Sequence, residues 1–346
     1  MEILTPKERL LTVLAREPVD RAPFICPGGM MNMAVTDVMD SVGVAWPEAH
    51  SDARLMARLT AGMYELAGVE NLGAPFCMTV EAEAMGASVG LGTRETEPRV
   101  DEYALDALCQ IDQLGSLDAS AGRAEVVVQA TGILSAAYPD VPVIADLTGP
   151  ISLATSLVDP LLFYRAMRRD KDAVHALLEV STDAAIAFGD ALVAAGADVV
   201  CIADPSATGE IIGGPAFAEF ALPYINAIVD HFAVAGVPSI VHICGDIRAL
   251  RGALRGISSP VISIDSLVSI ATLRELAPNH LTMGNVSTYL LEYGKPETLA
   301  QVARQRVEEG VDIVAPACGI GARTPLRNIL ALSDVVRAGR EGTAAC

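Results

Sequence analysis

The sequence predicts an α/β protein, a (β/α)8 TIM barrel with an N-terminal helical extension. Short and nearly all-apolar runs recur along the chain, as expected of parallel strands covered by helices. Longer helical patterns separate these runs, giving eight strand–helix units. The chain has 346 residues, 51% of them hydrophobic, which is enough for one large core. We therefore expect a single barrel domain over residues 1–346, with a doubly wound sheet as the alternative fold.

The elements follow in order from the N-terminus. The first is a predicted helix from Pro6 to about residue 15, with Thr5 as its N-cap. The expected strands are residues 22–26, 71–77, 142–147, 198–203, 238–244, 261–265, 281–285 and 311–315. Helix-length segments include residues 161–195, 215–235 and 296–309. Residues 103–137 also look helical and hold no convincing strand, so we expect them to decorate the barrel.

The charge balance restricts the possible partners. With 24 Lys and Arg against 43 Asp and Glu, the net charge is −19. Such a surface repels phosphate backbones and anionic lipid, so we expect neither nucleic acid nor a membrane as partner. The first residues lack an apolar signal core, and the seven cysteines show no paired framework. Reduced thiols and a cytoplasmic location are the expectation.

Three side chains at strand ends suggest a metal centre. His242 and Cys244 close the fifth expected strand, and Cys318 follows the last one. Residues two apart on a strand point to the same face, so this pair can bind one ion. Two sulfurs and one imidazole suit zinc and leave its fourth position open. The alternative is a hydrogen-bonded core histidine beside two buried cysteines.

The charge of this candidate site indicates its chemistry. Two thiolates and a neutral imidazole cancel the +2 of zinc, so the centre is a weak Lewis acid and a poor source of hydroxide. It is better suited to holding a substrate thiol as the thiolate, because a free thiol is mostly protonated at pH 7. Coordination keeps that sulfur nucleophilic, which predicts alkyl transfer to sulfur.

Further candidates lie at other strand ends. Glu81 and Glu83, after the second strand, are candidate occupants of the open position before substrate arrives, with Glu83 favoured as a catalytic group. The alternative is a helix first turn, where carboxylates are favoured by the dipole. Candidate substrate contacts are Cys77, Asp204, Asn285 and Ser287. The other histidines, His50, His175, His231 and His280, are expected on helices or surface loops.

Eight segments together resemble a known family: CPGGMMNM (26–33), PFCMTVEAE (75–83), LTGPISLA (147–154), ADPSATGE (203–210), FALPY (220–224), VHICG (241–245), MGNVST (283–288) and PACG (316–319). The chain resembles the methylcobamide:coenzyme M methyltransferases, a branch of the uroporphyrinogen decarboxylase superfamily. The resemblance implies zinc held by His242, Cys244 and Cys318. It also implies a small thiol substrate, coenzyme M, that takes methyl from methylcobalamin or another methylated corrinoid.

In that family the corrinoid is carried by a separate corrinoid protein. The apolar loop 30–33, which includes Met31, is our expected contact for the flat macrocycle, with ordinary core filling as the alternative. Three other functions stay open: methyl transfer to tetrahydrofolate, a uroporphyrinogen decarboxylase-like activity, and a non-catalytic zinc-binding barrel. The decarboxylases use an arginine-rich first loop, which this sequence lacks.

Overall fold

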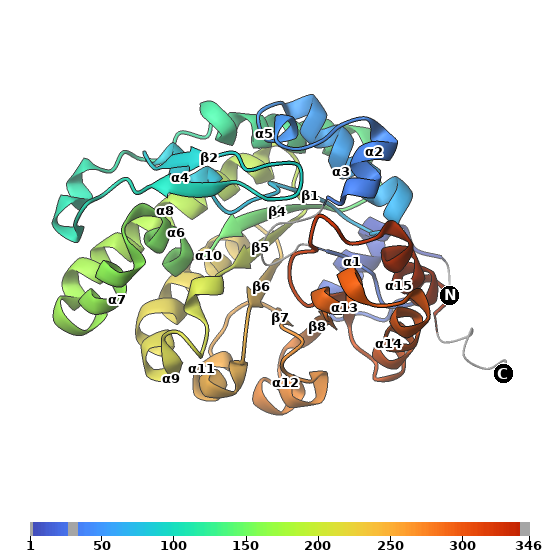
Figure 1. The fold of residues 1–346 in the computed structure, drawn as a ribbon. Coiled ribbons are helices and arrows are strands. Elements are labelled where there is room, and N and C mark those ends of the chain that lie inside the picture. Colours follow the sequence, from blue (N-terminus) through green and yellow to red (C-terminus); the bar gives the residue numbers. More distant parts are fainter. Residues whose placement is uncertain (1–2, 27–33, 340–346) are drawn as a thin grey trace.

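Seven parallel strands form one curled sheet in the order β1-β4-β5-β6-β7-β8-β9 in the computed structural model, which describes residues 3–26 and 34–339 (Figure 1). The strands are β1 (Leu72–Ala74), β4 (Val143–Thr148), β5 (Val199–Ala203), β6 (Ser239–Ile243), β7 (Val261–Ile264), β8 (Leu281–Val286) and β9 (Ile313–Pro316). Each lies within, or within one residue of, a run predicted from the sequence. β1 is short because Pro75 follows it, and proline has no N–H to continue a ladder.

The first predicted strand, residues 22–26, closes the ring between β9 and β1. It is reduced to one parallel bridge, between Phe24 and Val314. Side chains take the place of ladder carbonyls here: the Phe24 N–H donates to Glu70 at 3.0 Å, and the Cys26 N–H to Asn71 Oδ1 at 2.8 Å. On the same side the Glu70 N–H donates to the Phe24 carbonyl at 2.7 Å. The barrel is therefore closed, although this segment is not a regular strand.

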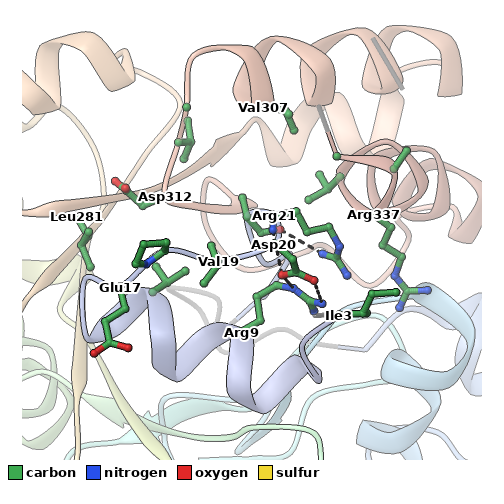
Figure 2. Close-up of a pocket in the computed structure, with 18 of the residues that line it drawn as sticks. Ile3, Arg9, Glu17, Val19, Asp20, Arg21, Leu281, Val307, Asp312 and Arg337 are labelled. Carbon is green, nitrogen blue, oxygen red and sulfur yellow. Dashed lines mark hydrogen bonds and ion pairs between the residues drawn. The ribbon is translucent and has the colours of Figure 1, made fainter. Parts of the chain in front are cut away.

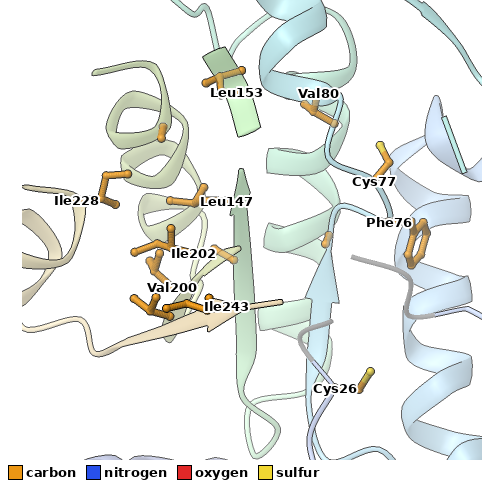
Figure 3. Close-up of a cluster of buried hydrophobic side chains, with 14 of the residues drawn as sticks. Cys26, Phe76, Cys77, Val80, Leu147, Leu153, Val200, Ile202, Ile228 and Ile243 are labelled. Carbon is orange, nitrogen blue, oxygen red and sulfur yellow. The ribbon is translucent and has the colours of Figure 1, made fainter. Parts of the chain in front are cut away.

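Helices surround the sheet (Figure 1). The α-helices are α1 (Pro6–Leu14), α2 (Thr36–Val42), α3 (Ala53–Ala67), α4 (Val80–Ala84), α5 (Gly122–Ala137), α6 (Pro150–Leu157), α7 (Pro160–Arg169), α8 (Lys171–Ala194), α9 (Gly213–Ala216), α10 (Leu222–Val234), α11 (Arg251–Leu254), α12 (Ile270–Leu276), α13 (Thr288–Tyr293), α14 (Pro296–Glu308) and α15 (Leu326–Ala338). Short 3₁₀ turns are η1 (Glu48–His50), η2 (Leu108–Gln113), η3 (Pro205–Ala207) and η5 (Ile247–Leu250), and η4 (Phe217–Ala221) is a π-helical turn. Figure 3 shows Ile228 of α10 facing Leu147 and Ile202 on the outer side of the strands.

Helix α1 closes the N-terminal end of the barrel. It begins as predicted at Pro6, with a capping box between Thr5 and Glu8. Its Leu10 and Val13 belong to the apolar cluster that fills the barrel interior, together with strand residues such as Ile144 and Ile240. The lower half of the barrel is thus a packed hydrocarbon core, and polar chemistry is confined to the opposite end.

Two features differ from the sequence prediction. Helix α5 does not decorate the barrel: it packs against β1, β4 and α3, as the barrel helix between β1 and β4. The chain between α4 and α5 instead carries an unpredicted antiparallel hairpin, β2 (Ser88–Gly90) and β3 (Arg99–Glu102). Its strands are short, polar and largely exposed, so no apolar period marks them.

Among the described residues, no helix combines the length and apolar character that a bilayer crossing requires.

Candidate metal centre

His242, Cys244 and Cys318 come together at the carboxyl end of the barrel, as the sequence predicts. His242 lies in β6, Cys244 directly follows that strand, and Cys318 lies two residues beyond β9. One ligand atom from each lies within 4.8 Å of the others, and no other group of three such side chains is found in the described parts of the chain. Gly245 makes the turn after Cys244 possible with a φ of 72°, and a Cβ there would also meet the Glu210 carboxylate.

The sulfur–sulfur distance fits a tetrahedral ion. The two sulfurs of Cys244 and Cys318 are 3.7 Å apart. Zinc–sulfur bonds at a tetrahedral angle place sulfurs about 3.8 Å apart. His242 Nε2 lies 3.1 Å from Cys244 Sγ, somewhat closer than the roughly 3.6 Å of an ideal site. The donor set of one nitrogen and two sulfurs is typical of zinc and leaves a fourth position for substrate.

Ser263 orients the histidine. His242 is 1% exposed, and its Nδ1 lies 2.9 Å from the Ser263 hydroxyl oxygen. With Nδ1–H donating to that oxygen, the lone pair of Nε2 is directed at the two sulfurs. A hydrogen bond at the distal ring nitrogen fixes tautomer and ring orientation in most histidine metal sites.

A hydrogen bond couples the thiols of Cys244 and Cys318. That bond and the neighbouring His242 hold the pKa of Cys318 well below its usual range. The same hydrogen bond, together with burial, raises the pKa of Cys244. The lowered pKa favours the thiolate form of Cys318, and a thiolate is the form of cysteine that binds metal.

Asp204, a predicted substrate contact, lies at the end of β5 and caps helix α6. It is 1% exposed and accepts hydrogen bonds from the N–H groups of Ile151 at 3.1 Å and Ser152 at 2.8 Å, and from the Ser152 hydroxyl at 2.6 Å. Burial raises its pKa to about 6, against the effect of those bonds. Gly149 is required beside it, since a Cβ at this position would clash with the Cβ of Asp204.

Asn285 and Ser287, also predicted contacts, organise loops at the mouth of the barrel. The Asn285 amide donates to the carbonyls of Asp265 at 2.9 Å and Val268 at 2.6 Å, which holds the loop after β7. Ser287 is the N-cap of α13 and accepts from the Leu290 N–H at 3.3 Å. Their role toward substrate stays a prediction, and Met31 lies outside the described residues.

The two candidate glutamates lie in different surroundings. Glu81 is fully buried and accepts bonds from the Thr148 N–H at 2.7 Å and hydroxyl at 3.0 Å. Glu83 instead forms an ion pair with Arg123. Arg123, which sequence reasoning missed, also donates to the sulfur of Cys77 at 3.2 Å. It lies on α5, 46 residues from Cys77, so no local spacing reveals the contact.

His50 ends the short helical turn η1, one of the two kinds of location expected from the sequence, and its side chain is buried. It is 1% exposed, with its ring 5.1 Å from that of Trp46 and 6.0 Å from that of Phe76. Neither ring nitrogen has a hydrogen-bond partner within the described chain. Burial, and to a lesser degree Arg123, lower its pKa to about 3. The ring is therefore a neutral part of an aromatic cluster.

A cavity of about 990 Å³ lies at the opposite end of the barrel (Figure 2). Its wall includes Val13 and Leu281, whose side chains pack in or against the apolar cluster that fills the barrel interior, which we call the apolar plug. Two of its arginines form ion pairs: Arg9 with Asp20, as the dashed lines show, and Arg21 with Glu70. The plug separates this cavity from the three metal-ligand candidates.

Comparison with known proteins identifies the family. The family model described as uroporphyrinogen decarboxylase (URO-D) matches residues 5–339. The chain is 33% identical to the methylcobamide:CoM methyltransferase MtbA of Methanosarcina acetivorans, over 94% of this chain and 95% of that protein. It is 30% identical to a methylated-thiol–coenzyme M methyltransferase of Methanosarcina mazei, over 98% of this chain and 90% of that one.

A solved structure agrees with these sequence relatives. A methyltransferase from Methanosarcina mazei superimposes with a TM-score of 0.89 and 31% identity, covering 97% of this chain and 99% of that one. The chain therefore belongs to the uroporphyrinogen decarboxylase superfamily, in its branch of methylcobamide:coenzyme M methyltransferases.

Proposed function

We propose that this protein is a zinc-dependent methyltransferase that moves a methyl group from a methylated corrinoid, carried by a corrinoid protein, to coenzyme M. One observation carries the proposal: a nitrogen and two sulfurs converge at the carboxyl end of the barrel, with 3.7 Å between the sulfurs. The names of the relatives supply the donor and the acceptor. A metal held by one nitrogen and two sulfurs suits the activation of a thiol, which is consistent with both the methyl donor and the methyl acceptor in these names.

The three ligands set the charge of the centre. Zinc held by His242, Cys244 and Cys318 would lower the pKa of an incoming thiol so that it binds as the thiolate. Because the thiolates of Cys244 and Cys318 would neutralise the ion, a substrate sulfur held there would keep its negative charge and remain a nucleophile. Ser263 keeps the His242 ring in place while the substrate sulfur is exchanged.

Methyl transfer then needs in-line approach of the donor. A lone pair of the substrate sulfur forms the new S–C bond, and the electron pair of the cobalt–carbon bond stays on the corrinoid. The product is a neutral thioether, a poorer ligand than a thiolate, and it leaves. The polar side chains of the proposed site lie at the carboxyl end of the barrel. The apolar plug beneath them excludes water from the N-terminal end.

The rim of the mouth offers apolar contacts for the donor. Four exposed side chains follow the carboxyl ends of β5, β7 and β8: Ile211, Leu267, Tyr289 and Tyr293. Isolated apolar side chains are common on surfaces, but these share the face that holds the three metal-ligand candidates. We assign this rim (Ile211, Leu267, Tyr289 and Tyr293) to contact with the corrinoid protein.

Thiol-dependent demethylation of methylcobalamin tests the function. Purified protein, analysed first for about one zinc per chain, is mixed with methylcobalamin and 2-mercaptoethanesulfonate, and the absorbance of the corrinoid is followed. We expect demethylation in the wild type and none in Cys318→Ala. Cys109→Ala is the matched control, because Cys109 is an exposed free cysteine.

The same assay separates the rivals. Demethylation by tetrahydrofolate but not by any thiol, in protein free of zinc, would contradict the proposal. So would full activity of Cys318→Ala with thiol. Decarboxylation of uroporphyrinogen without corrinoid activity would assign the chain to the other branch of its superfamily.

A further inference from the structure

Helix α7 exposes basic and apolar side chains together. It carries three arginines and no acidic residue, in a chain whose net charge is −19. Arg165, Arg168 and Arg169 are all exposed, and none of them forms an ion pair or a side-chain hydrogen bond within the described residues. Leu161 and Leu162 are 63% and 38% exposed. We call these five residues the α7 face.

The α7 face is one continuous surface of the helix. An α-helix turns by about 100° per residue, so positions 161, 162, 165, 168 and 169 fall within an arc of roughly 120°. The opposite side of the helix is buried and consists of Phe163, Ala166 and Met167. The solvent side of such an amphipathic helix is ordinarily polar. Two exposed leucines among the arginines depart from that pattern.

Helix α8 places the α7 face at the carboxyl end of the barrel. It follows α7 after one residue, packs on β4 and ends just before β5, so it runs antiparallel to the strands. Its 24 residues span about 36 Å, whereas the five residues of β5 span about 17 Å. The start of α8 therefore extends beyond the carboxyl ends of the strands, together with α7, which lies at the left edge of Figure 1.

Hydrogen bonds join α7 to the strand ends around the metal-ligand candidates. The Tyr164 hydroxyl of α7 donates to the Ser206 carbonyl at 3.2 Å. Ser206 lies in η3, directly after β5. Two residues earlier, the Asp204 N–H donates to the His242 carbonyl at 3.4 Å. The α7 face thus borders the same mouth as His242, beside the loop after β5 that carries Ile211 of the rim.

The charge of the α7 face indicates an acidic protein as its partner. Guanidinium groups bind carboxylates through paired hydrogen bonds, and the three arginines have no carboxylate partner in the described chain. The two leucines add apolar area beside them. Nucleic acid and anionic lipid fit less well, because the chain as a whole repels extended polyanions. An acidic patch of limited size can meet the local positive charge alone.

We propose that the α7 face docks an acidic patch of the corrinoid protein and steers that protein to the mouth of the barrel. This inference rests on the proposed function, in which the methyl donor arrives on a protein. The rim follows β5, β7 and β8, and the α7 face extends this contact surface to the side of β4. Opposite charges on two partners accelerate their encounter, so the gain applies to the protein donor and not to free methylcobalamin.

Charge reversal tests the α7 face with two methyl donors. One donor is a methylated corrinoid protein that the wild type demethylates with 2-mercaptoethanesulfonate, and the other is free methylcobalamin. At low salt we expect Arg165→Glu and Arg168→Glu each to lower kcat/KM for the protein donor about tenfold or more. Their activity with methylcobalamin should match the wild type, which also shows that they fold.

Arg304→Glu is the matched control. Arg304 is an exposed arginine on α14 that forms no ion pair within the described residues, so its reversal changes the net charge equally. We expect it to leave kcat/KM for both donors unchanged. A loss in Arg304→Glu as large as in Arg165→Glu would assign the effect to total charge and overturn the docking proposal.

Salt dependence is the second readout. The Debye length falls from about 30 Å at 0.01 M ionic strength to about 3 Å at 1 M. We expect kcat/KM of the wild type for the protein donor to fall over this range. The values for Arg165→Glu should change less, so that the difference between the two proteins shrinks at high salt.

Leu161→Ser tests the apolar part of the α7 face. We expect it to raise the KM for the protein donor and leave methylcobalamin turnover unchanged. Val234→Ser is the matched control, because Val234 is 92% exposed at the end of α10, which leads into the N-terminal end of β6.

The outcomes separate the docking proposal from the proposed function. Unchanged kcat/KM for the protein donor in both arginine reversals, or equal losses with both donors, would overturn the docking alone. A wild type that demethylates neither donor would overturn the proposed function. Binding of the wild type to phosphatidylserine vesicles, or its self-association in sedimentation, would assign the face to a membrane or to a second copy if Arg165→Glu abolished it.

Discussion

Ser263→Ala isolates the contribution of the hydrogen bond behind His242. The hydroxyl oxygen lies 2.9 Å from Nδ1, and both side chains are 1% exposed, so no solvent replaces the lost partner. Leaving a buried N–H unsatisfied costs about 1–3 kcal/mol. Part of that cost falls on the metal-bound state, because the ring is no longer fixed toward the sulfurs. Removing such a partner lowers metal affinity about 10- to 100-fold.

Zinc competition against a chromophoric chelator measures this effect. Ser259→Ala is the matched control: Ser259 lies before β7, is equally buried, and donates to the Ser239 carbonyl at 2.8 Å, away from the metal ligands. We expect Ser259→Ala to lower the free energy of unfolding while leaving the Kd for zinc unchanged. The reasoning is refuted if Ser263→Ala binds zinc as tightly as the wild type, or if both variants weaken binding equally.

Three further predictions concern stability and partner binding. Burial lowers the pKa of His50 to about 3 in the folded protein. Between about pH 6.5 and 3 the unfolded chain therefore binds one more proton, and the free energy of unfolding falls by about 1.4 kcal/mol for each pH unit of acidification. In urea unfolding, His50→Phe should show a weaker dependence of stability on pH than the wild type. Glu70→Gln leaves Arg9 and Arg21 without their shared buried carboxylate and should cost about 3–5 kcal/mol in thermal or urea unfolding. Leu267→Ser on the rim should raise the KM for a methylated corrinoid protein while leaving the rate with free methylcobalamin unchanged, and equal effects on both donors would contradict the rim assignment.

Much of the barrel and the convergence of the three metal-ligand candidates could be predicted because the signals are local. The apolar run 142–147 identifies a buried strand by itself, and the spacing of His242 and Cys244 places both side chains on one face. Cys318 could be added because parallel strands in a barrel end at the same rim. These inferences need only the period of a strand and the topology of the fold.

The remaining features depend on contacts between distant segments. Arg123 meets Cys77 only once α5 packs on β1. His50 is buried because Trp46 and Phe76 enclose it, and neither residue marks it as interior in sequence. Asp146 did carry a signal, since an acidic residue interrupts an otherwise apolar buried run. The sequence could not show that no cation among the described residues contacts the Asp146 carboxylate.

Helix α1 closes the base of the barrel, because Leu10 and Val13 belong to the apolar cluster that fills the interior there. Under the proposed function the metal, the thiol and the methyl donor would therefore all approach from the carboxyl end. A bulky corrinoid carrier seated over that entrance would trap whatever already lies inside. Kinetics should therefore be ordered, with the small thiol entering first and the methylated thioether escaping only after the carrier has departed.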